Sequence, residues 1–236
     1  MNKNDIDKLL ENKNFDELDD DDYIKIYQLF YEEAVKGNNE SQLLLGILYN
    51  YGKGVPQDYS KAAEWYAKSA EQGNVKAQYY LGEFYSDGSG VPQDYSKALI
   101  FYQKAAEQDY TDAQFNLGIL FYSGLGVIQN YSKALFWFKK AAEKGLANAQ
   151  NILGLIYNTG RGIDIDYKEA FNWFQKAADQ GFADSQYYLG NLYALGRGVK
   201  QNCIKSIELF KKAALQGHKE AIAMLEKSNV PIQEET

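Results

Sequence analysis

Leucine, glycine and aromatic residues recur along this chain at a fixed interval of 36 residues. In the first clear copy, Leu45, Gly46 and Tyr49 share one face of a helix at positions i, i+1 and i+4. The later copies are Leu81, Gly82 and Tyr85; Leu117, Gly118 and Phe121; Leu153, Gly154 and Tyr157; and Leu189, Gly190 and Tyr193. Because a glycine inside a helix costs about 1 kcal/mol relative to alanine, its return in every copy predicts a close approach by a neighbouring helix.

A second helix is predicted in each copy. A Gly-x-Gly pair ends the first helix, since glycine tolerates the left-handed conformation that follows a helix C-terminus. An Asp or Asn then supplies the N-cap of the second helix, because its side-chain oxygen can accept hydrogen bonds from the free N–H groups of that helix. These N-cap candidates are Asp58, Asp94, Asn130, Asp166 and Asn202. The second helix carries a small residue and, four positions later, an aromatic one, as in Ala62 and Tyr66.

The strict phase of the repeat predicts an all-α solenoid, in which each repeat stacks on the last. We expect a single domain over residues 1–236 with about 13 helices. Residues 1–38 fit a degenerate, acidic N-terminal capping repeat with Leu10 in place of the glycine, and residues 219–228 fit a C-terminal capping helix. Between them lie five full repeats, at 39–74, 75–110, 111–146, 147–182 and 183–218, and a flexible tail is expected over 229–236.

Three repeated segments carry a resemblance to a known family. Residues 77–82 (AQYYLG), 88–94 (GSGVPQD) and 98–106 (ALIFYQKAA), with their counterparts in each copy, resemble the Sel-one-like repeat (SLR) family, relatives of the tetratricopeptide repeat. The resemblance covers about residues 23–228. It implies a right-handed superhelical α-solenoid of antiparallel helix pairs, with the first helix of each pair on the concave face. It also implies a scaffold or adaptor that holds other proteins.

The net charge of −7 is concentrated near the N-terminus. Residues 1–40 hold 5 Lys and 12 Asp or Glu, which gives −7, and the remaining chain is neutral. The acidic run from Asp16 to Asp22 replaces the Gly-x-Gly turn of the degenerate repeat, and Asp22 stands at the N-cap position. We expect a solvated acidic loop here. Binding of a cation or a basic partner by this run is the alternative.

Composition excludes several partners. The neutral body has only two arginines, Arg161 and Arg197, so we expect no binding of nucleic acid. No apolar run approaches the roughly 20 residues of a membrane helix, and the first residues lack the apolar core of a signal peptide. A single cysteine, Cys203, fits a reducing compartment. The sequence therefore predicts a cytoplasmic protein without membrane insertion.

The chain shows no set of residues typical of an enzyme. The Gly-x-Gly loops lack the third glycine of a dinucleotide site and the Lys-Ser/Thr of a phosphate loop, so helix caps explain them. Some members of the SLR family are described as cysteine-rich and penicillin-binding, but paired cysteines and a Ser-x-x-Lys motif are missing here. Cys203 follows an N-cap, which can make a thiol reactive, but we attribute it to a drifted repeat position. We treat His218 as a surface turn residue, and predict no metal, no cofactor and no catalysis; a hydrolase is the remote alternative.

Residues that differ between copies are the candidates for partner binding. By resemblance to tetratricopeptide repeats, the concave positions lie six and three before the framework glycine and one, four and five after it. The candidates are Leu43, Ile47, Tyr79, Glu83, Phe115, Ile119, Tyr122, Asn151, Leu155, Asn158, Tyr187 and Asn191. Among them, Phe115, Ile119 and Tyr122 form a central apolar patch typical of an interface hot spot. Alternatively, these side chains are buried against neighbouring repeats.

Two functions fit this pattern. The first is a non-catalytic adaptor that binds a peptide or protein partner in the concave groove. The alternative is an immunity or inhibitor protein that neutralises a toxin or secreted effector, where the acidic N-terminal repeat could steer binding to a basic enzyme. The sequence does not identify the protein partner.

Overall fold

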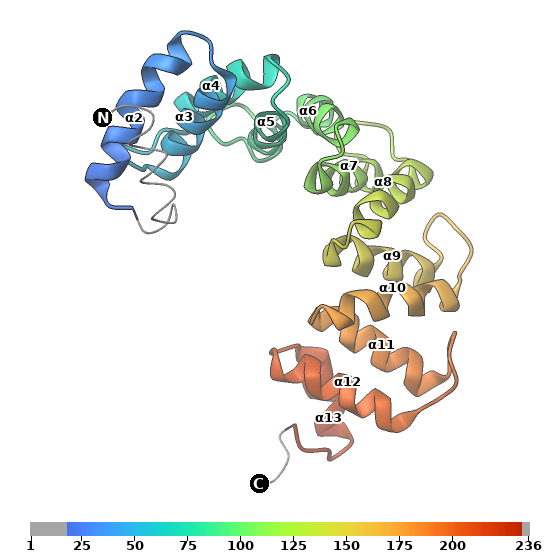
Figure 1. Ribbon diagram of the computed structural model, residues 1–236. Helices are drawn as coiled ribbons and strands as arrows, with labels where there is room; N and C mark the ends of the chain where they lie inside the picture. Colours follow the sequence, from blue (N-terminus) through green and yellow to red (C-terminus); the bar gives the residue numbers. More distant parts are fainter. Residues whose placement is uncertain (1–17, 233–236) are drawn as a thin grey trace. The chain divides into compact units, whose positions relative to one another are not determined.

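The computed structural model describes residues 18–232, which contain twelve α-helices and no strand (Figure 1). Residues 18–120 and 124–128 form one compact unit, and residues 121–123 and 129–232 form another. The helices of the first unit are α2 (Asp20–Val35), α3 (Asn39–Tyr51), α4 (Tyr59–Glu71), α5 (Val75–Asp87), α6 (Tyr95–Glu107) and all but the last turn of α7 (Thr111–Ser123). Those of the second are α8 (Tyr131–Glu143), α9 (Ala147–Thr159), α10 (Tyr167–Asp179), α11 (Ala183–Leu195), α12 (Cys203–Leu215) and α13 (Lys219–Lys227).

The all-helical, paired arrangement is confirmed. Helices α3, α5, α7, α9 and α11 begin 36 residues apart, as do α4, α6, α8, α10 and α12, and each of these ten helices has 13 residues. The predicted caps are also present, because the side chains of Asp58, Asp94, Asn130, Asp166 and Asn202 each accept a backbone N–H of the helix that follows. Of the roughly 13 helices expected, the first, with Leu10, lies outside the described residues.

The framework glycines allow the two helices of a repeat to approach closely, as the sequence predicts. A Cβ atom at Gly82 of α5 would lie 2.7 Å from Cδ1 of Tyr102 on α6. Gly190 of α11 faces Phe210 of α12 in the same way, at 2.8 Å. Leucines beside these glycines are fully buried, and so are most of the aromatic rings. The aromatic ring of the second helix therefore occupies the space that a side chain at the glycine would need.

The second glycine of each Gly-x-Gly pair joins successive repeats. Gly90 has a φ of 68°, and a Cβ there would collide with the backbone of Tyr59 and Ser60 at the start of α4. The Ser60 hydroxyl donates to the Gly90 carbonyl at 3.1 Å across this contact. Glycine is needed at this place for both its conformation and its size. The loop of one repeat thus lies directly against a helix of the repeat before it.

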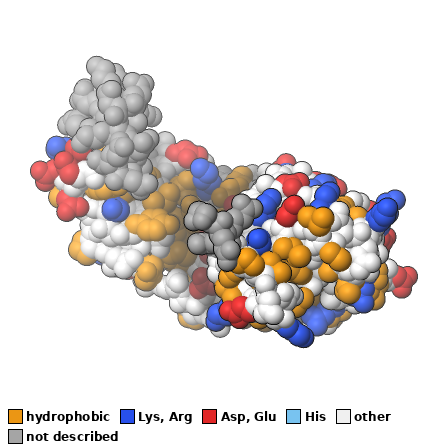
Figure 2. All heavy atoms as spheres, turned by 90° about the horizontal axis from the view of Figure 1, so that it is seen from below, with side chains coloured by type: hydrophobic (Ala, Val, Ile, Leu, Met, Phe, Trp, Pro, Cys, Tyr) orange, Lys and Arg blue, Asp and Glu red, His pale blue; other side chains and the backbone are white. Residues whose placement is uncertain are grey.

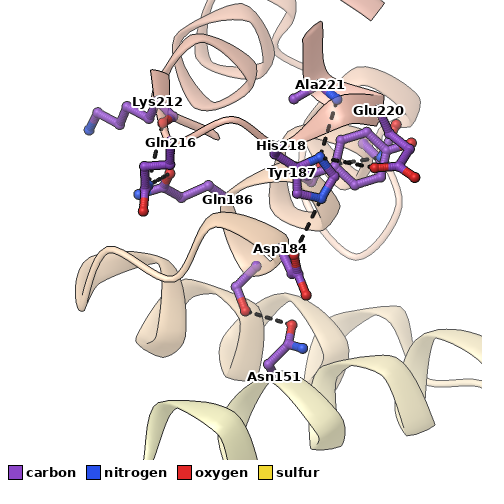
Figure 3. A network of polar contacts seen from close by, with 11 residues as sticks. Asn151, Asp184, Gln186, Tyr187, Lys212, Gln216, His218, Glu220 and Ala221 are labelled. Atoms are coloured by element: carbon purple, nitrogen blue, oxygen red, sulfur yellow. Dashed lines mark hydrogen bonds and ion pairs between the residues drawn. The ribbon is translucent and has the colours of Figure 1, made fainter. Parts of the chain in front are cut away.

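Buried glutamines form a second connection between repeats. Gln78 of α5 donates through Nε2 to the Ala70 carbonyl at 3.2 Å, and its Oε1 accepts from Gln108 at 2.8 Å. Gln186 makes the equivalent bond to Gln216, at 2.9 Å (Figure 3). Each glutamine adds a bond to a carbonyl in the last turn of the preceding helix, which also accepts a backbone N–H of the turn that follows. The glutamine recurs at a constant phase of the repeat, but its role becomes visible only in the folded structure.

The acidic N-terminal segment differs from the expectation. Asp22 was predicted as an N-cap after a solvated loop, but α2 begins at Asp20 and its N-cap is Asp19, whose carboxylate accepts the Asp22 N–H at 2.8 Å. The run is therefore helical from Asp20 onward, and Asp22 itself is buried. The physical reason is that carboxylates in a first helical turn interact favourably with the free N–H groups of that turn. Asp16 lies outside the described residues.

The surface of the described chain mixes side-chain types. Figure 2 shows hydrophobic side chains lying among basic and acidic ones on the face in view. No helix within residues 18–232 has the length and the apolar character needed to cross a membrane.

Candidate functional site

The twelve predicted binding residues lie on the first helices of the five repeats. Two of them, Leu43 and Asn151, are buried, and the other ten are half-buried. The first unit holds Leu43, Ile47, Tyr79, Glu83, Phe115 and Ile119, and the second holds Tyr122, Asn151, Leu155, Asn158, Tyr187 and Asn191. The predicted central patch of Phe115, Ile119 and Tyr122 lies on α7. Phe115 and Ile119 belong to the first unit, and Tyr122 belongs to the second.

A cavity of about 320 Å³ opens in the first unit. Its walls come from α5, α6 and α7 and from the start of the loop that follows α7. The lining residues are Glu83, Ser86, Asp87, Tyr95, Tyr102, Asn116, Ile119, Leu120 and Leu125. Two of the predicted binding residues, Glu83 and Ile119, are thus brought together here. Ser86 and Asp87 also stand at positions that differ between copies, whereas Tyr95 and Tyr102 stand at positions that are aromatic in most copies, so the lining combines variable and recurring residues.

The carboxylate of Glu83 is held by a neighbour one helical turn away. Tyr79 donates its hydroxyl to Glu83 Oε1 at 2.7 Å. Burial raises the pKa of the Glu83 carboxyl, the bond from Tyr79 opposes that rise, and the charges of Asp87 and Asp112 add to it. Burial also raises the pKa of Tyr79 and of Tyr102. The cavity is therefore acidic, partly shielded from water and rich in hydroxyl groups.

Tyr79 and its counterpart Tyr187 also serve the packing of the repeats. The Tyr79 ring lies 5.0 Å from that of Tyr110 and 6.0 Å from that of Tyr102. In the second unit the Tyr187 ring stacks on His218 at 4.7 Å and lies 5.7 Å from Phe210. These aromatic candidates are thus part of the contact between a helix pair and the turn that leads to the next repeat.

The remaining candidates of the second unit bind mainly to their own unit. Asn151 accepts from the Ser185 hydroxyl at 2.8 Å, and Asn191 donates to the Tyr187 carbonyl at 3.2 Å. Arg161 donates to the Tyr122 hydroxyl at 3.0 Å. The Arg161 guanidinium also lies over the Tyr122 ring, 5.9 Å from the ring centroid. Leu155 and Asn158 are half-buried on α9. Three of these candidates therefore already have hydrogen-bond partners within the second unit.

His218 is not the surface turn residue that the sequence predicts. Its side chain is only 10% exposed, and its Nδ1 accepts the Ala221 N–H at 3.2 Å as the N-cap of α13 (Figure 3). Its Nε2 lies 3.4 Å from Asp184. Asn38 and Asn74 occupy the same place in earlier repeats and cap α3 and α5. Those two asparagines were the signal in the sequence that would have indicated a capping role.

The part of the chain between residues 18 and 232 shows no group of three or more His, Cys, Asp or Glu side chains that could hold a metal ion. Cys203 is exposed at the first position of α12, directly after the N-cap Asn202.

Comparison with known proteins identifies the repeat. The family model "Sel1 repeat" matches residues 39–74, 75–110, 111–146, 147–182 and 183–218. A protective antigen of uropathogenic Escherichia coli that displays an SLR fold is 35% identical, with a TM-score of 0.82. The match covers 88% of this chain and 45% of the antigen, so the chain spans less than half of that protein. A Sel1 repeat protein from Oxalobacter formigenes is 33% identical, with a TM-score of 0.78, over 87% of this chain and 82% of that one.

A search among curated proteins finds no match. The five matched repeats account for most of the chain, and the helix pairs, their glycine contacts and their caps recur in each. The chain therefore belongs to the Sel1 repeat family, and its fold is the solenoid-like SLR fold.

Proposed function

We propose that this protein is a non-catalytic adaptor that binds a peptide or protein segment at the open cavity of its first unit. The observation that supports this most directly is that residues differing between repeats, Glu83 and Ile119 among them, line the cavity. The leucines, glycines and aromatic residues that recur in the repeats pack against one another inside the protein. A surface that varies over a constant scaffold is typical of recognition.

The side chains of the cavity are suited to an extended segment with mixed chemistry. Ile119 and Leu120 supply apolar contact, and Ser86, Asn116 and Tyr95 supply hydrogen-bonding groups. Such a combination of an apolar centre and polar surroundings is the usual composition of a protein interface. Sel1 and tetratricopeptide-like repeats generally bind proteins, which agrees with this assignment.

Site-specific photo-cross-linking tests the proposal with a matched pair of isoleucines. Ile119 lines the cavity, whereas Ile100 is an exposed residue of α6 that does not. A benzophenone amino acid at position 119 should cross-link one partner in the source cells, and the same probe at position 100 should not. Equal cross-linking at both positions, or cross-linking at position 100 alone, contradicts the proposal.

A charge placed in the cavity gives a second measurement. Ile119→Lys should weaken capture of the partner at least about tenfold, which corresponds to about 1.4 kcal/mol, whereas Ile100→Lys should leave it unchanged. Circular dichroism of both variants checks that the fold is retained. The identity of the partner then separates the two candidate roles, since an immunity protein requires a toxin or effector whose killing co-expression relieves.

A further inference from the structure

Position 83 differs in kind from its counterparts in the other repeats. The equivalent residues are Ile47, Ile119, Leu155 and Asn191, so only one of the five copies places an ionisable group there. All five are half-buried on the first helix of their repeat. A carboxylate at such a position loses part of its hydration, a cost that isoleucine or leucine avoids. The fold does not require Glu83, since the other repeats are built without it.

No basic residue among those that line the cavity compensates the charge of Glu83. The cavity is lined by two carboxylates, Glu83 and Asp87, and by no lysine, arginine or histidine. Asp112 adds a third negative charge close enough to act on Glu83. The polar partner of Glu83 in the described chain is the neutral hydroxyl of Tyr79. The cavity therefore presents negative charge on a partly desolvated floor, where an incoming cation would be attracted more strongly than at an open surface.

The remaining walls are apolar and aromatic. Ile119, Leu120 and Leu125 contribute aliphatic surface, and Tyr95 and Tyr102 contribute rings. A long basic side chain matches both parts of this lining, because its methylene stem packs on apolar surface while its charged end reaches a polar group. Tyrosine rings also attract cations.

We propose that this cavity takes a basic side chain, lysine or arginine, of the bound segment, with its charged end at Glu83 and Asp87. The stem then lies along Ile119 and Tyr102. This inference rests on the adaptor function proposed above and specifies the chemistry of its partner: a segment with a basic residue in its centre. Glu83, the only ionisable residue at its position among the five repeats, would thus set specificity at one place on the scaffold.

Short blocked peptides test the assignment without knowledge of the partner. The probes are Gly-Gly-Lys-Gly-Gly and the same peptide with arginine, norleucine or glutamate at its centre, and the observable is the NMR signal of the Ile119 methyl groups in the full chain. The lysine and arginine peptides should cause saturable shifts that weaken as the salt concentration rises. The norleucine and glutamate peptides should cause no saturable shift.

Variants of Glu83 connect the binding to this carboxylate. Glu83→Gln keeps the shape of the side chain and should weaken the lysine peptide at least about tenfold. Glu71→Gln, at an exposed acid on α4, is the matched control and should have no effect. Glu83→Ile introduces the residue that two of the other repeats carry at this position. It should abolish binding and raise the melting temperature, which a purely structural role for Glu83 would not produce.

Three results would overturn the inference: equal binding of the norleucine peptide, unchanged binding by Glu83→Gln, or no saturable shift with either basic peptide. The photo-cross-linking at Ile119 does not depend on the charge at position 83. A positive cross-link together with a negative peptide titration would therefore reject the basic side chain while leaving the adaptor function in place. The reverse combination would reject the adaptor function alone.

Discussion

Gly154 of α9 and Phe174 of α10 fit together so closely that a Cβ atom on the glycine would lie 2.5 Å from Cδ1 of the ring. In an exposed helix, Gly154→Ala would stabilise by about 1 kcal/mol through helix propensity. Here we expect the opposite sign, since overpacking typically costs about 1–3 kcal/mol. The urea midpoint should fall in the Ala variant.

The pair can be checked by a double-mutant cycle. Phe174→Leu removes the ring that meets the new methyl group, so the double variant Gly154→Ala/Phe174→Leu should be more stable than the sum of the single changes predicts. Additive free energies would show that the glycine is present for a reason other than this contact.

The buried amide of Gln150 should matter far more than a surface amide of the same type. Gln150 donates to the Ala142 carbonyl at 3.0 Å and accepts from Gln180 at 2.8 Å. Gln150→Leu removes both of these bonds, each worth about 0.5–1.5 kcal/mol, so it should lower the free energy of unfolding by about 1–3 kcal/mol in urea denaturation. The side-chain amide of Gln175 donates to Asp179 at the surface. Gln175→Leu should therefore lower the free energy of unfolding by only about 0.2–0.5 kcal/mol. Similar losses for the two variants would argue against a structural glutamine ladder.

The imidazole of His218 should stabilise α13 as an acceptor. His218→Phe keeps a ring against Tyr187 but removes the acceptor, and loss of an N-cap costs about 1 kcal/mol. Backbone amides of α13 should then exchange with solvent about fivefold faster, since exchange reports local opening. His218→Asn, the residue found at positions 38 and 74, should restore protection. Protection unchanged in the Phe variant would be inconsistent with capping.

Alkaline pH should weaken the first unit through Tyr27. Its hydroxyl lies 2.9 Å from that of Tyr49. Burial, and to a smaller extent this hydrogen bond, raise the pKa of Tyr27 to about 12. The folded protein thus holds this proton more tightly than the unfolded chain, whose tyrosines titrate near pH 10. The stabilising contribution is complete below pH 10 and is lost as the pH rises through 12.

The measurement is the free energy of unfolding between pH 10 and 12. Tyr27→Phe should show a shallower decline in this window than the wild type, because it has no proton to lose at this position. Tyr51→Phe, at an exposed tyrosine, controls for the removal of a hydroxyl group. A decline equally steep in the Tyr27 variant would place the cause elsewhere.

Capping in this chain shows where reasoning from the sequence succeeds and where it needs the fold. Asp58 and Asn130 cap their helices because an N-cap needs only a short acceptor and three following residues, all of which are local. For α2 the same reasoning chose Asp22, but the helix begins earlier, at Asp20, with Asp19 as its cap. Four consecutive aspartates offer several equivalent caps, and packing of the buried Tyr23 and Ile26 decides among them.

The candidate site divides in the same way. Comparison of the copies identified Glu83 and Ile119 as variable, and the structure brings both to one cavity. The same comparison selected Leu43 and Asn151, which the structure buries. Tyr79, Phe115 and Tyr187 stand at the same position of their repeats and are only half-buried, so the position alone does not predict burial. Their environment is set by side chains about 30 residues away, such as Ser185 for Asn151.

Helix periodicity and residues a few positions apart are enough to predict the repeat length, the helix pairs, their glycine contacts and most of their caps. Which variable side chains line a cavity and which are buried is known only from the folded structure. Those outcomes depend on the packing of one repeat against the next. Burial is a property of the neighbours that the fold provides, and the repeating pattern is the same for all of them.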